Sequence, residues 1–323
     1  MPKDIQFKTI LDLVNVFPNE KACHEYLAYQ RWGDEMPCPY KDCNGDNAYI
    51  FKDGIRRKCT CCKRIYTAKT GTFMEASKLP TIKWIMAIYL VLHKKGISSV
   101  QLGKDLGVRQ ATAWFMLSRI REGLGNEKDE QLEGNVVSDE TFCGGRNKNR
   151  HRDKKVKQSQ GRSFKDKTPV LGLMQTNEYS YDENGKPIIV KPSRVKCFVV
   201  ANTGAKAIQP IVRANVKAGS DFTSDEWSAY NGLSDTYNHQ VVDHGRGQYM
   251  NDAGYTSNAI EGFWGQCKRS INGIYVKPTR KHLQKYFYEF AFRHNYRNLG
   301  FQSQMNIIIS NMECRLKYKD LVA

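Results

Sequence analysis

Four of the ten cysteines are arranged as two pairs, and this arrangement constrains the local fold more than any other feature of the sequence. The pairs have the spacings Cys38-x4-Cys43 and Cys59-x2-Cys62, with 15 residues between them. Two such turns can bring four thiolates around one tetrahedral zinc ion, and the short strands between them are too small to fold without it. The spacing therefore predicts a zinc ribbon over residues 34–78.

One further cysteine, Cys61, leaves the fourth ligand open. It could replace Cys62, although a two-residue spacer fits a metal-binding turn better. Half of the ten cysteines fall between positions 38 and 62, and the others are scattered. This distribution favours a metal site in a reducing compartment over a set of disulfide bonds, so we expect one structural Zn²⁺.

The net charge of the chain points to a polyanionic partner. The sequence has 50 lysines and arginines against 33 aspartates and glutamates, which gives a formal net charge of +17. Such a field concentrates phosphate-bearing ligands, so we expect a nucleic-acid partner. The longest uninterrupted apolar run, Ile85 to Leu92, is too short to cross a bilayer, and no signal peptide precedes it. We therefore expect a cytoplasmic protein with no membrane partner.

A helical hairpin is expected in residues 79–124. One helix begins at Ser99, Gly107 makes a tight turn, and a second helix begins at Arg109. This pattern is typical of a helix-turn-helix, whose second helix enters the major groove of DNA. The side chains that would face the groove are Arg109, Gln110 and Thr112. The alternative is a helical hairpin that only packs against its neighbours.

Residues 134–300 have the pattern of a mixed α/β domain. Strands are expected around position 139, over 168–176, over 194–201 and over 222–225, with a helix over 205–215. The first of these strands carries Asp139, and the last ends at Asp225. Because side chains alternate along a strand, Asp139 and Glu140 should face opposite ways, and only one of them should join a common site.

A further acidic side chain lies on an amphipathic helix, Ser257 to Ile271. Its apolar stripe comprises Ile260, Phe263, Trp264, Cys267 and Ile271, and its adjoining flank comprises Asn258, Glu261, Lys268 and Arg269. Glu261 and Lys268 lie two turns apart and only about 20° out of register. Acids on two strands and a later helix can converge on a pair of divalent cations either side of a phosphodiester. A solvated helix face is the alternative.

A strongly basic segment separates the first expected strand from the second. Between residues 146 and 167, ten lysines and arginines accompany only two aspartates. Such a segment lacks the apolar residues to fold alone, so we expect it to bind a phosphate backbone, with a solubilising loop as the alternative. The expected DNA contacts are Arg146, Lys148, Arg150, Lys154 and Lys155, together with Lys268 and Arg269 on the later helix.

In these features the sequence resembles the zinc-ribbon-bearing insertion-sequence transposases of the DDE type, the bacterial ISXO-like group related to eukaryotic Merlin elements. The resembling stretches are Arg57 to Thr72, Val137 to Gly145, Thr223 to Leu233 and Thr256 to Tyr275, which occur in the family's order. The resemblance implies a ribonuclease-H-like catalytic domain and a bacterial, nucleoid-associated enzyme.

The resemblance also implies a reaction. The enzyme would bind the terminal inverted repeats of its element, cleave the ends and join the freed 3′-hydroxyls to target DNA, using two Mg²⁺ or Mn²⁺ ions. Asp139 would bridge the ions, and Asp225 and Glu261 would each complete one coordination shell. Lys268 would steady the DNA end.

Two of these roles have alternatives. Asn258 lies one turn before Glu261, and some relatives use an asparagine there, but a carboxylate binds Mg²⁺ more strongly and Glu261 has the seven-residue offset to Lys268. His244 stands where the family often has a histidine. It would contact the scissile phosphate or assist proton transfer, unless its role is structural.

The expected organisation is an N-terminal helical segment 1–33, the zinc ribbon 34–78, the helix-turn-helix 79–124, the catalytic domain 134–300 with its basic loop 146–167, and a C-terminal helical tail 301–323. Double-stranded DNA would be the partner, both as element ends and as target. A homodimer or higher oligomer would hold two ends, although no heptad repeat indicates one. A non-catalytic DNA-binding regulator and a metal-dependent nuclease or resolvase are the alternative functions.

Overall fold

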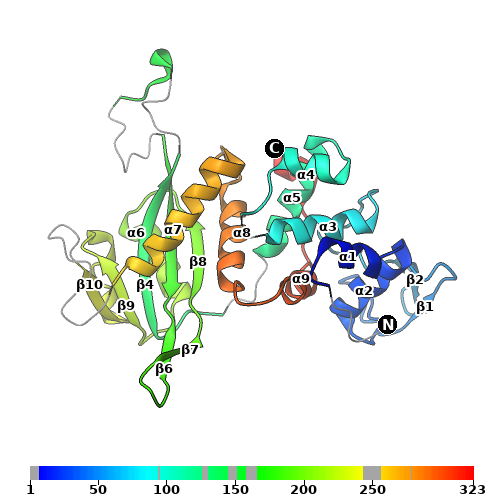
Figure 1. Cartoon of the computed structure of the whole chain (residues 1–323), viewed down its shortest axis with the longest axis horizontal. Coiled ribbons are helices and arrows are strands. Elements are labelled where there is room, and N and C mark those ends of the chain that lie inside the picture. Colours follow the sequence, from blue (N-terminus) through cyan, green and yellow to red (C-terminus); the bar gives the residue numbers. More distant parts are fainter. Residues whose placement is uncertain are drawn as a thin grey trace. The chain divides into compact units, whose positions relative to one another are not determined.

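The computed structural model describes residues 7–93, 95–125, 130–144, 151–157, 166–242, 256–276 and 278–323. The chain divides into two compact units (Figure 1). The first combines Met1–Glu127 with Tyr296–Ala323, and the second is Lys128–Asn295. The C-terminal segment therefore belongs to the same unit as the ribbon and the helical hairpin, and the finer five-part division stays a prediction.

The helices of the first unit pack around α3 (Thr81–Leu92). The other helices described in this unit are α1 (Ile10–Val16), α2 (Glu20–Trp32), α4 (Ser99–Leu106), α5 (Gln110–Leu124), α9 (Phe301–Ser310) and α10 (Tyr318–Val322). The apolar sequence of α3 fits its surroundings, because α1, α2, α4, α5 and α9 all contact this helix. Its Trp84, Ile85 and Ile88 are buried. Asn19 is the N-cap of α2, since its side chain accepts a hydrogen bond from the Ala22 amide.

The ribbon contributes three short antiparallel strands in the order β1-β2-β3. Their bounds are Ala48–Ile50, Arg57–Cys59 and Ile65–Tyr66. Within these strands the apolar residues Tyr49, Ile50 and Ile65 are exposed, while Tyr66 and Cys59 are buried. So small a core agrees with the expectation that the ribbon needs a metal ion to fold.

The predicted helical hairpin is formed by α4 and α5. Gly107 ends α4 in the left-handed region at φ +59°, where a residue without a Cβ has little strain. The Ser98 side chain caps the start of α4, and Arg109 is the N-cap residue of α5. Two helices and a tight turn therefore stand where they were expected.

The second unit is built on a five-stranded mixed sheet in the order β10-β9-β4-β5-β8. Its strands are β4 (Asn135–Cys143), β5 (Thr168–Gln175), β8 (Arg194–Val199), β9 (Asp221–Asp225) and β10 (Asn238–Val242). Strand β4 pairs antiparallel with β5, which pairs antiparallel with β8; β4 and β9 are parallel, as are β9 and β10. The predicted mixed α/β class is confirmed.

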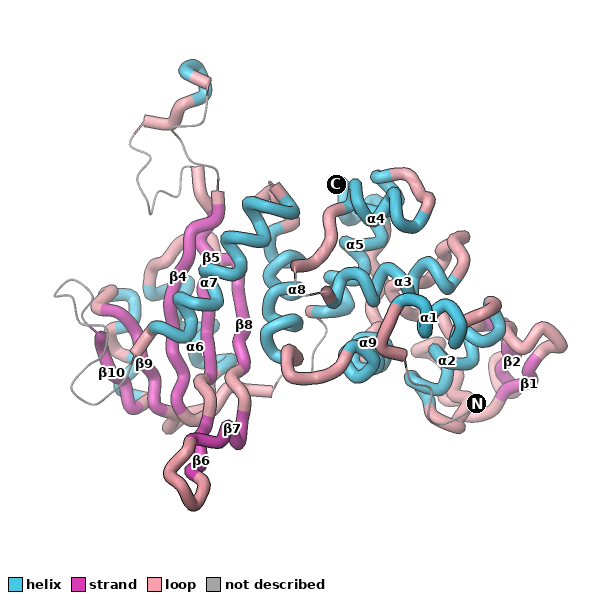
Figure 2. Tube along the Cα trace, in the orientation of Figure 1, coloured by secondary structure: helices cyan, strands magenta, loops and turns pink. Residues whose placement is uncertain are grey.

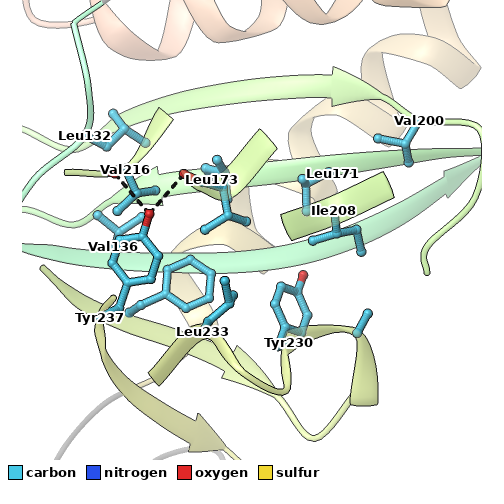
Figure 3. Packing of buried hydrophobic residues seen from close by; sticks show 13 residues of the cluster. Leu132, Val136, Leu171, Leu173, Val200, Ile208, Val216, Tyr230, Leu233 and Tyr237 are labelled. Atoms are coloured by element: carbon cyan, nitrogen blue, oxygen red, sulfur yellow. Dashed lines mark hydrogen bonds between the residues drawn. The ribbon is translucent and has the colours of Figure 1, made fainter. Parts of the chain in front are cut away.

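Helices cover both faces of this sheet (Figure 2). On one face, Ile208 and Val212 of α6 (Ala205–Asn215) pack against strand residues that include Val136 (Figure 3). On the other face, α7 (Asn258–Ser270) and α8 (Leu283–Asn295) pack against strand residues that include Val137. Neighbouring residues of β4 therefore belong to different cores, and every residue of β5 is buried because both faces are covered.

Three further elements of the second unit complete the description. A two-stranded ribbon, β6 (Glu178–Tyr181) and β7 (Pro187–Lys191), extends the hairpin between β5 and β8. After β9 the chain makes a 3₁₀ turn over Ser228–Tyr230. The predicted helix from Ser257 is α7, which continues as one π-helical turn over Ile271–Tyr275.

Candidate active site and metal centres

The four paired cysteines lie together in the ribbon. The sulfur atoms of Cys38, Cys43, Cys59 and Cys62 are all within 4.8 Å of one another. Two of the separations, Cys38 to Cys62 and Cys43 to Cys59, are 3.7 Å. A zinc–thiolate tetrahedron with bonds of about 2.3 Å has edges of about 3.8 Å, so the donor set and its spacing fit a zinc ion.

The surroundings of the cluster favour Cys62 over Cys61. The Cys61 side chain is exposed, whereas its backbone amide donates to the Cys59 sulfur at 3.3 Å. Hydrogen bonds from the Arg64 guanidinium and backbone amide lower the pKa of Cys62 to about 6, so its thiolate is present at neutral pH. A Cβ at Gly45 would lie 2.8 Å from the Cys59 sulfur, which explains the glycine beside the cluster.

Asp139 and Asp225 stand at the same level on neighbouring strands. In the parallel β4–β9 ladder, Asn135 pairs with Asp221 and Val137 with Thr223. The same register, carried two residues further, brings Asp139 level with Asp225, the last residue of β9. The crevice outside the carboxyl ends of parallel strands is a common ligand site in α/β proteins. Two carboxylates remote in sequence therefore meet at this edge.

The orientation of Asp139 is restrained by a tryptophan. Trp264 of α7, a buried residue, donates from Nε1 to Asp139 Oδ2 at 2.9 Å. The indole has room because Gly172, which pairs with Asp139 in the β4–β5 ladder, has no side chain. Burial is the main cause that raises the pKa of Asp139 to about 6; the Asp225 carboxylate also acts to raise it, while hydrogen bonds from the Glu140 backbone amide and from Trp264 act to lower it. A nearby cation would favour the ionised form.

Glu140 also reaches this group, and the prediction that only one of the two neighbouring acids could do so was wrong. Carboxylate oxygens of Asp139, Glu140 and Asp225 lie within 4.8 Å of one another. The described β4–β9 pairing ends at Val137 and Thr223, while β4 continues to Cys143. Strand alternation separates the two side chains within the sheet, but beyond the end of this pairing both can reach the same opening.

Helix α7 supplies the other charged groups of the site. Together with residues of β4 and those at the end of β9, it lines a pocket of about 450 Å³. The lining residues are Asp139, Glu140, Thr141, Asp225, Glu226, Glu261, Trp264, Gly265 and Lys268. The predicted side-by-side placement of Glu261 and Lys268 thus brings both into one pocket with the two aspartates. Glu261 Oε1 accepts a hydrogen bond from Ser257 Oγ at 2.9 Å.

The remaining predicted residues are less closely tied to the pocket. Asn258, the first residue of α7, is exposed and is not among the described lining residues; Arg269 is exposed on the same helix. On the hairpin, Arg109 and Gln110 are exposed and Thr112 is half-buried, with Gln110 Nε2 donating to Ser99 Oγ at 2.8 Å. Lys155 is exposed. His244, Arg146, Lys148, Arg150 and the Lys154 side chain lie outside the described residues.

Sequence reasoning missed four residues around the pocket. Glu140 was set aside by strand alternation, and Trp264 was assigned only to the apolar stripe of its helix. Tyr230 and Glu226, which follow Asp225 in the chain, were not among the predicted site residues. No local pattern signals the contacts of Trp264 and Tyr230, because their partners lie 125 and 90 residues away in the sequence.

The donor atoms of this pocket have the chemistry of a divalent-cation site. Carboxylate oxygens are the ligands that Mg²⁺ and Mn²⁺ prefer, and clustered carboxylates are mutually repulsive until a cation joins them.

Within the described ranges, no helix is both long and apolar enough to cross a membrane.

Two comparisons show what this chain is similar to. The family described as the ISXO2-like transposase domain matches residues 131–295, which contain the five-stranded sheet, α7 and α8. An uncharacterized protein in the transposable element ISH50 of Halobacterium salinarum is 25% identical over 247 residues. That alignment covers 74% of this chain and 79% of the archaeal protein.

Proposed function

The chain belongs to the ISXO2-like transposase family, and on this premise we propose that it is a DNA transposase with a ribonuclease-H-like catalytic domain. It binds the terminal inverted repeats of its insertion sequence, cleaves the element ends and transfers their 3′-hydroxyl strands to target DNA. One observation carries this proposal: Asp139 and Asp225 meet on neighbouring parallel strands and share a pocket with Glu261 and Lys268.

In this proposal, Asp139, Asp225 and Glu261 would hold two Mg²⁺ or Mn²⁺ ions, and Asp139 would be shared by both. Such ions, when bound, activate the attacking oxygen and neutralise the leaving oxygen of the phosphodiester. Trp264 holds the Asp139 carboxylate in one orientation through its 2.9 Å hydrogen bond. Lys268 contributes a positive charge to an otherwise acidic pocket, which lowers the repulsion between the carboxylates and an entering DNA phosphate.

The choice of Glu261 over Asn258 as the third ligand remains a proposal. It is supported by the position of Glu261 in the pocket lining and by the charge of its carboxylate. In an Mn²⁺-supported end-cleavage assay, Glu261→Gln should abolish cleavage and Asn258→Ala should retain it. Retained cleavage in the glutamine variant together with loss in the alanine variant would assign the role to Asn258.

DNA binding would be shared by the ribbon, the helix-turn-helix and the basic loop. The overall charge of +17 supports a DNA partner, because a basic surface releases counterions from the phosphate backbone. Arg109 and Gln110 are exposed at the start of α5, the helix that would enter a major groove, with Thr112 beside them. Two element ends have to be held together, so we propose that a homodimer or larger oligomer acts on DNA in the cytoplasm.

The decisive experiment incubates the protein with a labelled element end, a supercoiled target plasmid and Mg²⁺. The proposal predicts a joined product for the wild type. Asp139→Asn and Asp225→Asn should bind the element end with unchanged affinity and give no product. End binding without any strand cleavage in the wild type would indicate a regulator, and cleavage without joining would indicate a nuclease or resolvase.

A further inference from the structure

Glu140 is held in the pocket by the buried Tyr230 hydroxyl, which is itself hydrogen-bonded to Ser138. The Tyr230 hydroxyl donates to Glu140 Oε1 at 2.6 Å, and the same hydroxyl lies 2.9 Å from Ser138 Oγ. Tyr230 is 1% exposed and Ser138 is 2% exposed. Because a phenol has only one proton and gives it to Glu140, the serine must be the donor in the second hydrogen bond. The relay therefore runs from Ser138 through Tyr230 to the carboxylate.

This relay holds the Glu140 carboxylate in place. Burial, and then the Glu140 carboxylate itself, raise the pKa of Tyr230 well above its ordinary value, so the phenol stays protonated and remains a donor. The Tyr230 ring packs in the core shared by β4, β5, β9 and α6 (Figure 3). A buried aromatic ring that ends in a hydrogen bond to a carboxylate orients that carboxylate in the manner of groups that support metal ligands.

The carboxylate that the relay orients lies among the acids of the pocket. Its oxygen is within 4.8 Å of oxygens of Asp139 and Asp225. Ligand oxygens around a Mg²⁺ ion at about 2.1 Å lie about 3–4 Å apart, so small side-chain movements would bring these three onto one ion. Glu261 lines the same pocket but is outside this compact set.

We propose that Glu140 supplies a fourth carboxylate to the divalent-cation site, with Tyr230 as its positioning residue. Glu140, Asp139 and Asp225 would form the compact set that holds a cation, together with Glu261 from α7. This inference rests on the proposed function, because the cation is the one that the transposase reaction uses. It differs from that function in adding an acid that the strand pattern of the sequence had excluded.

The test is a titration of the DNA-free, zinc-loaded protein with Mn²⁺. Electron paramagnetic resonance measures the concentration of free Mn²⁺ at each step of the titration. Glu140→Gln keeps the shape of the side chain and should weaken Mn²⁺ binding at least tenfold. Tyr230→Phe removes only the anchoring hydroxyl and should weaken it about tenfold, as losses of groups behind metal ligands do. Glu226→Gln is the matched control: it removes one carboxylate from the same pocket lining and should change the affinity less than threefold.

The outcomes separate this inference from the proposed function. If Asp139→Asn abolishes Mn²⁺ binding while Glu140→Gln binds like the wild type, Glu140 is not a ligand and the two-aspartate site stands. Equal losses in the Glu140 and Glu226 variants would also overturn the inference, because they would indicate an effect of net charge alone. A wild-type protein that binds no Mn²⁺ would contradict both this inference and the proposed function. If the Glu140 variant does not fold, the Mn²⁺ affinity of Tyr230→Phe tests the inference instead.

Discussion

Gly172→Ala should damage the second unit and its proposed active site together. A Cβ at this position would lie 2.4 Å from Cζ2 and 2.7 Å from Cη2 of Trp264, and 3.0 Å from Cδ1 of Ile260. Carbon atoms pack at about 3.5–4.0 Å, so the indole has to move by about 1 Å. Trp264 is buried between the sheet and α8, where its ring meets that of Phe287. The core offers it little room.

The expected size of the effect follows from the packing. Overpacking of a core destabilises by about 1–3 kcal/mol, which lowers the melting temperature of a unit of this size by about 2–10 °C. The same movement stretches the bond from Trp264 Nε1 to Asp139 Oδ2, now 2.9 Å. A hydrogen bond to a charged group contributes about 1.5–3 kcal/mol, so end cleavage should fall by about 10- to 100-fold.

Gly262→Ala is the matched control for this variant. Gly262 lies on α7, and a Cβ there would meet nothing within 4 Å. Alanine in a helix is more stable than glycine by about 0.5–1 kcal/mol, so this variant should melt at or above the wild-type temperature. Calorimetry and an end-cleavage assay at 25 °C would measure both effects. A Gly172→Ala protein that melts lower but cleaves at the wild-type rate would refute the role of Trp264.

Three further predictions concern the zinc cluster, the buried aspartate and a buried ion pair. Cys59→Ser should lose its zinc and destabilise the first unit, whereas Cys61→Ser should keep one zinc per chain, as metal analysis would show. Burial raises the pKa of Asp139 from 3.8 to about 6, so without divalent cations its contribution to stability is present below about pH 4 and lost as the pH rises through about 6. In urea unfolding, Asp139→Asn should reduce the dependence of the free energy of unfolding on pH. The affinity of the wild type for Mn²⁺ should rise over the same pH range. Glu289 is fully buried in an ion pair with Arg293, so Glu289→Ala should lower the free energy of unfolding by about 3–5 kcal/mol in urea titrations.

Local patterns in the sequence predicted much of this molecule. The cysteine spacing predicted the cluster that forms in the ribbon, because ligand spacing within a metal-binding turn is a local property. The period of apolar residues predicted α7 and placed Glu261 and Lys268 on the same flank. The helix over 205–215 was predicted with the bounds that the structure has. In each case the residues that determine the structure lie close together in the sequence.

What could not be predicted depends on contacts between distant segments. Strand alternation set Glu140 aside, because the rule cannot show where a neighbouring strand ends and a side chain becomes free to turn. The relay from Tyr230 requires that β4 and the turn after β9 be adjacent, which only the sheet order establishes. The sequence predicted a C-terminal helical tail over 301–323 but not its neighbours, one of which is the Phe73 amide that donates to the Met312 carbonyl at 3.1 Å within the first unit.

The central claim is that Asp139 and Asp225 hold divalent cations, and anomalous diffraction from crystals soaked in Mn²⁺ tests it most directly. The zinc bound by the ribbon cysteines would serve as an internal standard for the anomalous signal. The account predicts manganese peaks within about 2.3 Å of carboxylate oxygens of both aspartates. A clear zinc peak in the ribbon with no manganese peak between these two carboxylates would contradict it.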